Sequence, residues 1–246
     1  MSRTLKALPL MLAVAALGVI VASCGTANQA QVRVINAIPD SGPTDIWFNG
    51  TRKVSSMQFG QVFPTPAANA TYFSIASGSN LIQGFEPGDS TDPISPIGTV
   101  LLNGTINYTV LAVGLEADAS PPLVLIDDNI APTSNNLEYR IINVSPSSPL
   151  TGVDVYIVPP GTNITTYTPQ ISALGNGQGS AYQSVPFIAG GYAVIVTQSA
   201  KKTALLTQLS AARAGSITTM VLLDNPSPTG TQNGMSQTPL VLSDLN

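Results

Sequence analysis

The sequence predicts an all-β chain folded into two tandem immunoglobulin-like antiparallel β-sandwich domains. Runs of Val, Ile, Thr, Tyr and Phe alternate with Gly, Pro, Asn, Asp and Ser, which is the pattern of short strands joined by turns. About seven such runs occur per roughly 100 residues, the strand density of an immunoglobulin-like sandwich. The set of runs then occurs a second time along the 246 residues.

The segment before the first run differs from the rest of the chain. Arg3 and Lys6 precede an apolar run at 7–22. This run has 16 residues, fewer than the roughly 20 that span a bilayer as a helix. A short charged region followed by an apolar one is typical of an export signal.

The apolar run ends in Val21-Ala22-Ser23-Cys24-Gly25. This motif resembles the lipobox of bacterial lipoproteins, where the cysteine is diacylated and becomes the first residue of the mature chain. We therefore predict a lipoprotein signal peptide at 1–23, followed by lipidated Cys24 and a tether at 24–31. Two acyl chains are enough for stable anchoring, so the lipid bilayer is the first expected partner.

These features predict a location in the bacterial cell envelope, periplasmic or surface-exposed. Gly25, rather than Asp, follows the cysteine, which favours the outer membrane. Removal of Arg3 and Lys6 with the signal peptide leaves 7 basic against 13 acidic residues, a net charge of −6. An acidic chain of this kind does not fit a nucleic-acid partner.

The rest of the chain is an internal repeat. Five blocks recur in the same order: Val32-Arg33-Val34-Ile35-Asn36 with Tyr139-Arg140-Ile141-Ile142-Asn143, Asp45-Ile46-Trp47-Phe48 with Asp154-Val155-Tyr156-Ile157, Tyr72-Phe73-Ser74-Ile75 with Tyr192-Ala193-Val194-Ile195, Gly104-Thr105 with Gly215-Ser216, and Pro122-Leu123-Val124-Leu125 with Pro239-Leu240-Val241-Leu242. We predict sandwich domains at 32–129 and 138–246. The short polar linker between them, 130–137, is expected to permit some domain rotation.

Each repeat is expected to contain seven or eight strands. The predicted strands are 31–37, 45–49, 54–59, 70–77, 97–102, 107–114 and 122–126, then 138–144, 153–158, 169–174, 182–187, 191–198, 203–209, 217–223 and 239–243. Alternation assigns the faces: Ile46 and Phe48 point one way, and Asp45 and Trp47 point the other.

The opening motif of each repeat is an alternating strand, then Asn-x-x-Pro, then Asp–aliphatic–aromatic. This motif, with Leu102-Asn103-Gly104-Thr105 leading into Tyr108-Thr109-Val110, resembles the DUF4397 domain. The resemblance implies tandem immunoglobulin-like sandwiches in an exported bacterial protein. Asn36 and Asn143 depart from the family pattern, which often has His there.

Composition excludes several kinds of catalytic site. The chain has no histidine and one cysteine, so it lacks Ser-His-Asp and Cys-His machinery and His-ligated zinc. Asp127 and Asp128 are adjacent in sequence and would point to opposite faces of a strand, so they cannot form a glycosidase pair. Lys201 and Lys202 follow Ser199 in a polar turn, where a solvated hairpin is favoured over a Ser–Lys dyad. We predict no enzyme activity and no cofactor.

Two sets of residues are candidates for binding. Trp47 and Tyr156 occupy the same repeat position, out of phase with the apolar residues, so they are predicted to face outward and could contact a partner. The alternative is that they cover a sheet edge or the domain seam. Weak calcium candidates recur at turn positions in both repeats: Asp45, Asp154, Asp127 and Asp244. The alternative is that these carboxylates close turns, and no metal is predicted.

The sequence therefore predicts a non-catalytic binding or structural module of the envelope. Its partner would be an envelope glycan or another protein, reached through the end loops at 39–44, 147–152 and 225–238. The alternative is a hydrolase, or an accessory subunit of one, that acts on envelope polysaccharide. A passive stalk without a ligand is a third hypothesis.

Overall fold

The computed structural model describes residues 28–65, 71–94, 98–116, 120–127, 135–211, 213–226 and 234–244. Cys24 and the predicted signal segment lie outside these residues, as does most of the predicted linker. The described chain is almost entirely strands and turns, with one short 3-10 helix, η3, at Ile164–Thr166. The all-β prediction is confirmed.

Each repeat contributes nine strands. The first contains β1 Gln29–Asn36, β2 Thr44–Phe48, β3 Thr51–Met57, β4 Val62–Phe63, β5 Phe73–Ala76, β6 Gly78–Phe85, β7 Gly98–Leu102, β8 Asn107–Val113 and β9 Ser120–Asp127. The second contains β10 Asn136–Asn143, β11 Val153–Val158, β12 Ile171–Leu174, β13 Gln178–Gly179, β14 Gln183–Pro186, β15 Tyr192–Gln198, β16 Ala204–Ser210, β17 Ile217–Leu222 and β18 Leu240–Ser243.

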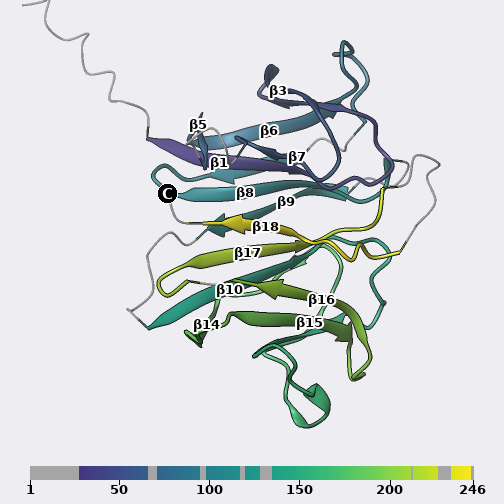
Figure 1. The fold of residues 1–246 in the computed structure, drawn as a ribbon. Coiled ribbons are helices and arrows are strands. Elements are labelled where there is room, and N and C mark those ends of the chain that lie inside the picture. Colours follow the sequence, from purple (N-terminus) through teal and green to yellow (C-terminus); the bar gives the residue numbers. More distant parts are fainter. Residues whose placement is uncertain are drawn as a thin grey trace, which may run out of the picture.

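The strands form two sandwiches with the same topology. In the first, a sheet ordered β4-β1-β8-β9, with β5 also on β1, packs on a sheet ordered β3-β2-β6-β7. In the second, β13-β10-β17-β18, with β14 on β10, packs on β12-β11-β15-β16 (Figure 1). Most pairs are antiparallel, but β1 runs parallel to β8 and β10 runs parallel to β17.

This strand order differs from that of an immunoglobulin constant domain, in which the first strand lies at a sheet edge. Here β1 lies inside its sheet, with β8 on one side and both β4 and β5 on the other. A central first strand is buried on both faces, and β1 shows this in its run of buried residues from Val32 to Asn36. The sandwich class is therefore as predicted, whereas the uniformly antiparallel pairing is not.

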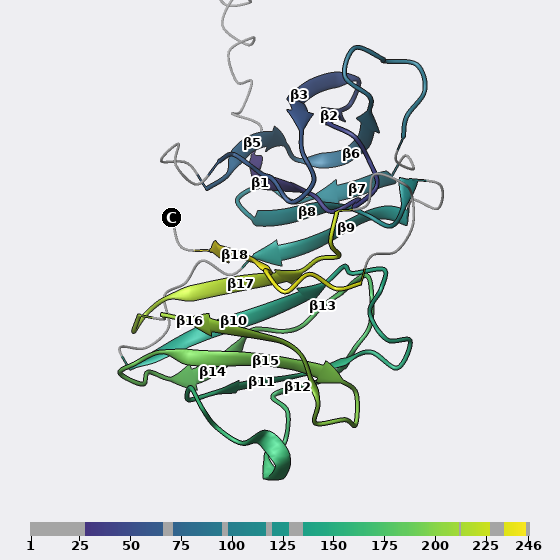
Figure 2. The same ribbon diagram turned by 45° about the vertical axis from the view of Figure 1, so that its right-hand side comes forward.

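The two sandwiches pack against each other and form a stack of four sheets (Figure 2). A third apolar cluster joins them, with Ile35 and Leu111 on one side and Ile142 and Val221 on the other. The packing is close, since a Cβ added at Gly179 would lie 2.6 Å from a terminal methyl of Leu125. The expectation of domain rotation about the linker was therefore wrong, because a large apolar interface holds the domains together.

The structure also corrects the repeat alignment. The strand that follows Tyr72, β5, pairs with β1, and its counterpart on β10 is β14, which follows Tyr182. Tyr72 is therefore equivalent to Tyr182, not to Tyr192. The error arose because β6 was not predicted: its opening Gly78-Ser79-Asn80 has the composition of a turn. β6 is the true counterpart of β15, since each pairs with the second strand of its repeat.

Candidate functional site

Two arginines are buried between the sandwiches, at equivalent positions of β1 and β10. Arg33 and Arg140 both point out of their own sandwich, on the faces that carry Ile35 and Ile142. Each guanidinium crosses to the other repeat: Arg33 Nη2 bonds a carboxylate oxygen of Asp244, and Arg140 Nη2 lies 2.5 Å from Asp127 Oδ1. The two sandwiches thus exchange arginines across their interface.

Each arginine also donates to a threonine hydroxyl and to a backbone carbonyl. Arg33 Nε donates to Thr109 Oγ1 at 2.7 Å, and its Nη1 donates to the Ser243 carbonyl at 3.1 Å. Arg140 Nε donates to Thr219 Oγ1 at 3.1 Å, and its Nη1 donates to the Ile126 carbonyl at 2.8 Å. Every donor nitrogen of both side chains is therefore used, which is what a buried guanidinium needs.

Each carboxylate is also surrounded by donors. Asp127 Oδ2 accepts from Thr109 Oγ1 at 2.6 Å and from the Tyr72 hydroxyl at 3.0 Å. Asp244 Oδ2 accepts from Thr219 Oγ1 at 2.5 Å and from the Tyr182 hydroxyl at 2.7 Å. The arginine–aspartate cluster thus consists of two equivalent sets: Arg33, Tyr72, Thr109 and Asp127 in the first sandwich, and Arg140, Tyr182, Thr219 and Asp244 in the second.

The charges in the cluster perturb the neighbouring groups. Burial raises the pKa of the Tyr72 hydroxyl, and the nearby Asp127 charge raises it further. Burial likewise raises the pKa of Tyr182. Burial alone would lower the pKa of Arg33, but the charges of Asp127 and Asp244 outweigh it and raise that pKa. Near neutral pH the two phenols therefore stay neutral donors and Arg33 stays charged.

The cluster suits a structural role better than a chemical one. Its arginines and aspartates are buried and paired with one another, as charges that hold two domains together would be. Sequence reasoning missed it, although a signal was present. Arg33 and Arg140 occupy the same position of an otherwise apolar strand in both repeats, and a charge there needs a buried partner.

The two predicted outward aromatics have different surroundings. The alternation was predicted correctly, because Ile46 and Val155, which flank them, belong to the sandwich cores. Trp47 is half-buried on the outer face of its sheet. The centroid of its ring lies 5.4 Å from that of Phe85, in an edge-to-face arrangement. Tyr156, however, is only 1% exposed. The prediction that both rings face solvent was therefore wrong for Tyr156.

Tyr156 is buried by a loop and a lysine. Ile164, in η3, packs beside Tyr156 on the outer face of the second sandwich. Lys202 lies over the ring, with its Nζ 4.5 Å from the ring centroid and 2.9 Å from the hydroxyl oxygen. A ring covered in this way cannot form one partner surface with Trp47. Lys202 is part of this packing, in a turn as expected.

The candidate calcium ligands do not converge. Asp127 and Asp244 belong to the arginine–aspartate cluster. Asp45 accepts from the backbone N–H of Ser56 and from Arg52, and Asp154 accepts from the N–H groups of Ala173 and Ala200. The carboxylates of Asp45 and Asp154 thus close turns, and no group of three potential metal-ligating residues occurs in the described part of the chain.

Asn36 and Asn143 are buried at the ends of β1 and β10. Asn36 donates to the Met57 carbonyl at 3.1 Å, and Asn143 donates to the Leu174 carbonyl at 3.0 Å. Each side-chain oxygen accepts from a backbone N–H two residues later. These amides join the two sheets of each sandwich and face no open site.

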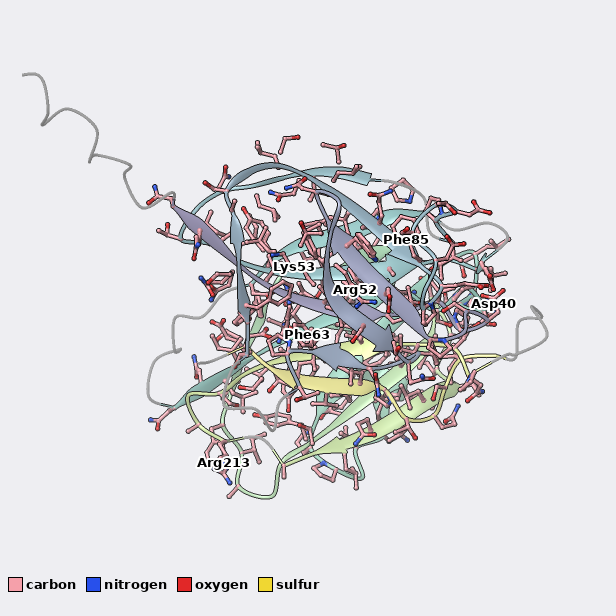
Figure 3. The ribbon with its side chains drawn as sticks, turned by 90° about the horizontal axis from the view of Figure 1, so that it is seen from above. Asp40, Arg52, Lys53, Phe63, Phe85 and Arg213 are labelled. Carbon is pink, nitrogen blue, oxygen red and sulfur yellow. The ribbon has the colours of Figure 1, made fainter. Side chains whose placement is uncertain are left out.

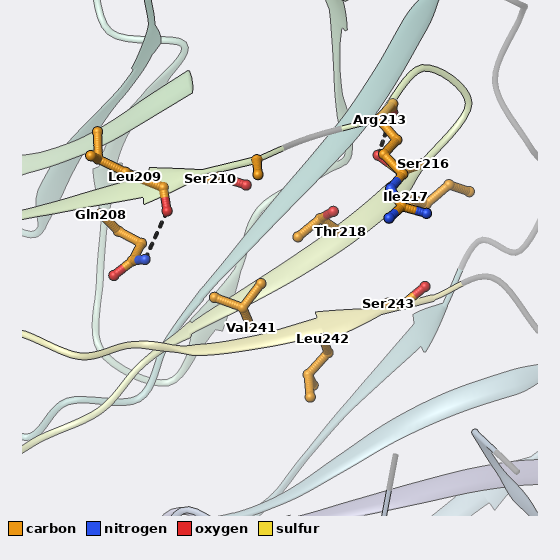
Figure 4. Close-up of a pocket in the computed structure, with 11 residues that line it drawn as sticks. Gln208, Leu209, Ser210, Arg213, Ser216, Ile217, Thr218, Val241, Leu242 and Ser243 are labelled. Carbon is orange, nitrogen blue, oxygen red and sulfur yellow. Dashed lines mark hydrogen bonds between the residues drawn. The ribbon is translucent and has the colours of Figure 1, made fainter. Parts of the chain in front are cut away.

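A groove of about 410 Å³ lies on the second sandwich (Figure 4). It lies between β16, at the edge of the outer sheet, and β17 and β18 of the inner sheet. Leu209 and Val241 contribute exposed apolar surface, and Arg213 is an exposed cation at one end. Ser216 Oγ donates to the Arg213 carbonyl at 2.7 Å, so this hydroxyl is bonded to another residue that lines the groove. The groove offers a surface for contact, without a nucleophile beside a base.

The comparison with protein families shows to which family this chain belongs. The family described as "Domain of unknown function (DUF4397)" matches residues 30–156, which is more than half of the chain. This chain belongs to the DUF4397 family. No curated protein matches it.

The DUF4397 match runs past the first sandwich. It includes Arg33, Asp127 and Arg140, and it ends inside β11. The matched stretch therefore contains both arginines of the cluster. In the described part of this DUF4397 protein, no helix is long and apolar enough to span a membrane.

Proposed function

We propose that this DUF4397 protein is a bacterial lipoprotein, anchored through Cys24, whose tandem DUF4397 repeats form one rigid, non-catalytic module outside the cytoplasm. The observation that carries the proposal is the sequence Val21-Ala22-Ser23-Cys24-Gly25 after a positively charged and then apolar segment. The module binds or spaces a component of the cell envelope, a glycan or another protein.

The repeat proposal is supported by the paired architecture. Both halves have the same strand order, and each supplies one arginine and one aspartate to the cluster. A structural role is supported by the hydrogen bonds of these buried charges, since every guanidinium nitrogen has a partner. A binding surface is best sought in the end loops, because loops on a rigid scaffold commonly carry recognition.

One such loop contains a polar cluster. Ser145 and Ser147 follow β10, and both hydroxyls donate to the carboxylate of Asp224, which follows β17. The Gly234 N–H in turn donates to Ser147 Oγ at 3.2 Å. These bonds hold the described parts of the 147–152 and 225–238 loops against each other, so the two loops form a single surface.

The anchoring is tested with the full-length chain in a bacterial host. Labelled palmitate is expected to enter the wild type and not Cys24→Ser, which should also keep its signal peptide. Mass spectrometry of the mature N-terminus gives the cleavage site. An unlabelled wild-type protein, cleaved elsewhere or not at all, would contradict the proposal.

Binding is tested with residues 25–246, which contain every described strand. The protein is incubated with fractionated envelope, and retained glycans and proteins are identified. Leu150→Asp, in the 147–152 loop, is expected to lose the retained component, whereas Thr207→Asp, exposed on β16, should keep it. No retention above background would leave the spacer role.

A further inference from the structure

The molecule has two distinct ends. β1 and β10 begin at one end and run in the same direction (Figures 1 and 2). Arg33 and Arg140, near the starts of these strands, meet in one cluster. We call the end where these strands begin the tether end; it includes the turns at Gly104, Phe187 and Arg213. The opposite end, which carries the loops 39–44 and 147–152, is the far end.

Backbone contacts place these turns at the tether end. The Thr105 N–H donates at 2.9 Å to the carbonyl of Gln29, the first residue of β1. Near the start of β10, the Phe187 N–H donates to the Asn135 carbonyl at 2.7 Å. The Gly215 N–H donates to the Asn136 carbonyl at 2.8 Å.

Exposed apolar side chains gather at the tether end, one in each layer of the stack. Leu101 ends the outer sheet of the first sandwich, and Ile126 ends the inner one. Phe187 follows β14 of the second inner sheet, and Leu209 lies near the end of β16 in the last sheet. Leu101 is 69% exposed and Leu209 is 64% exposed. Four large exposed apolar side chains therefore lie at the tether end.

The remaining exposed apolar groups do not form a second such set. Ile188 is beside Phe187 at the tether end. Leu150 lies at the far end, whereas Tyr167, Leu205 and Val241 are on the sides of the sandwich. The tether end therefore has more exposed apolar side chains than the other described surfaces.

Exposed acidic residues, in contrast, gather at the far end. The exposed or half-buried carboxylates at the far end are Asp40, Glu86, Asp89, Asp92 and Glu116. Among the described carboxylates, the tether end holds Asp127 and Asp244, which are buried against arginines, and half-buried Glu138. Its exposed cations include Arg213 and Lys53, and Lys53 lines a depression with Gln29. Arg52, which precedes Lys53, is paired with Asp45. Figure 3 shows Asp40 and Arg213 at opposite ends.

The far end also carries cations. Lys201 and Lys202 lie in the turn between β15 and β16, and Lys202 is bonded to Tyr156. The far end as a whole still has more carboxylates than cations. The charges thus favour an anionic surface at the tether end and disfavour one at the far end.

We propose that the tether end lies on the lipid bilayer, with Leu101, Ile126, Phe187 and Leu209 at the headgroup boundary and the strands upright. This inference rests on the proposed acylation of Cys24. Cys24 is five residues from Gln29, a span of at most about 18 Å. So short a tether keeps the start of β1 next to the membrane, and the exposed apolar side chains of this end are held near the lipid, where their burial is favourable.

This orientation determines where a partner is met. An eight-residue strand such as β1 is about 26 Å long, so the far-end loops are held at least that far from the lipid. The acidic far end then faces away from the anionic headgroups. A partner of the far-end loops would accordingly be engaged above the membrane and not in it.

The test forces anchoring, so that it does not depend on native acylation. Residues 25–246 contain neither histidine nor cysteine. An N-terminal hexahistidine tag can therefore bind them to nickel-chelating lipid in phosphatidylcholine–phosphatidylglycerol vesicles. One introduced cysteine, Ala211→Cys at the tether end or Thr151→Cys at the far end, carries a fluorophore that spin-labelled headgroups quench.

We expect quenching at residue 211 and little at residue 151. The triple variant Leu101→Asn, Phe187→Asn, Leu209→Asn should lower quenching at residue 211 toward that at residue 151. The control Leu150→Asn should not. Circular dichroism confirms that each variant folds.

Equal quenching at the two labels, or stronger quenching at residue 151, would overturn the orientation. So would unchanged quenching in the triple variant, because the tether alone would then account for the proximity. Failure of the proposed lipoprotein function is registered separately, by the absence of palmitate from Cys24.

Discussion

Arg33, in the first strand of the chain, hydrogen-bonds the carboxylate of Asp244, which follows the last strand. Its counterpart Arg140 makes the reciprocal bond to Asp127. The two sandwiches are thereby joined through buried ion pairs, and the shorter arginine–aspartate contact of each arginine crosses the interface.

Removal of one arginine should be costly. Arg33→Met leaves Asp244 buried without its principal cation, and we expect a loss of about 3–5 kcal/mol in the free energy of unfolding. Asp244→Leu combined with Arg33→Met should recover part of that loss, because the unpaired charge is then absent. Denaturant titrations of the two single variants and the double variant give the coupling energy, and purely additive losses would contradict the pairing.

The two sandwiches should unfold together. Trp47, the only tryptophan, reports on the first sandwich, whereas far-ultraviolet circular dichroism reports on both. Because the third apolar cluster and the arginine–aspartate cluster join the halves, we expect the two signals to have the same transition midpoint in urea. Ile142→Asp, which buries an unpaired charge in that interface, should separate the midpoints. Separate midpoints in the wild type would show that the halves are independent.

Stability should fall at alkaline pH. The pKa of Tyr72 is raised in the folded state, by burial first and by Asp127 second, so the folded protein keeps the phenolic proton after the unfolded chain has lost it. This contribution is complete below a pH of about 10, the ordinary tyrosine pKa, and declines above it.

The expected slope from Tyr72 is about −1.4 kcal/mol of unfolding free energy per pH unit above that point. Tyr72→Phe should show a shallower decline by that amount, measured by denaturant unfolding at a series of alkaline pH values. Identical slopes in the wild type and the variant would mean that Tyr72 ionises as freely in the folded protein as in the unfolded chain.

Two glycines separate backbone strain from crowding. Gly152 has φ +80° and Gly161 has φ +79°, so alanine is strained by a similar amount at either position. A Cβ at Gly152 would also lie 2.7 Å from the Ala173 carbonyl oxygen, whereas nothing lies within 4 Å at Gly161. Gly161→Ala should cost about 1 kcal/mol, and Gly152→Ala should cost about 1–3 kcal/mol more. Thermal unfolding measures both, and equal losses would show that the backbone at Ala173 yields freely.

Several features could be predicted from the sequence because they depend on local patterns. The strand positions follow from runs of β-branched and aromatic residues between turn residues, and β1, β8 and β17 lie within a few residues of their predicted bounds. The core faces at Ile46 and Val155 follow from alternation alone. The family resemblance was also carried by these patterns, and it is confirmed over residues 30–156.

β6 shows where local patterns fail. Gly78 and Asn80 indicate a turn, yet they begin an eight-residue strand, because Asn80 is buried and bonds the Ala76 and Gly78 carbonyls. Once this strand is in place, Tyr72 aligns with Tyr182 and not with Tyr192. The equivalent roles of the two tyrosines in the arginine–aspartate cluster could not be recognised without it.

By itself, the sequence determined the fold class and the alternation of faces, since both are encoded by neighbours along the chain. The tertiary structure decided what lies on the outward faces. Tyr156 points away from its core as predicted, but the Ile164 loop covers it. Arg33 is charged and yet buried, because the second sandwich supplies Asp244. A side chain's exposure depends on segments distant in sequence, and so it was known only when the four sheets were stacked.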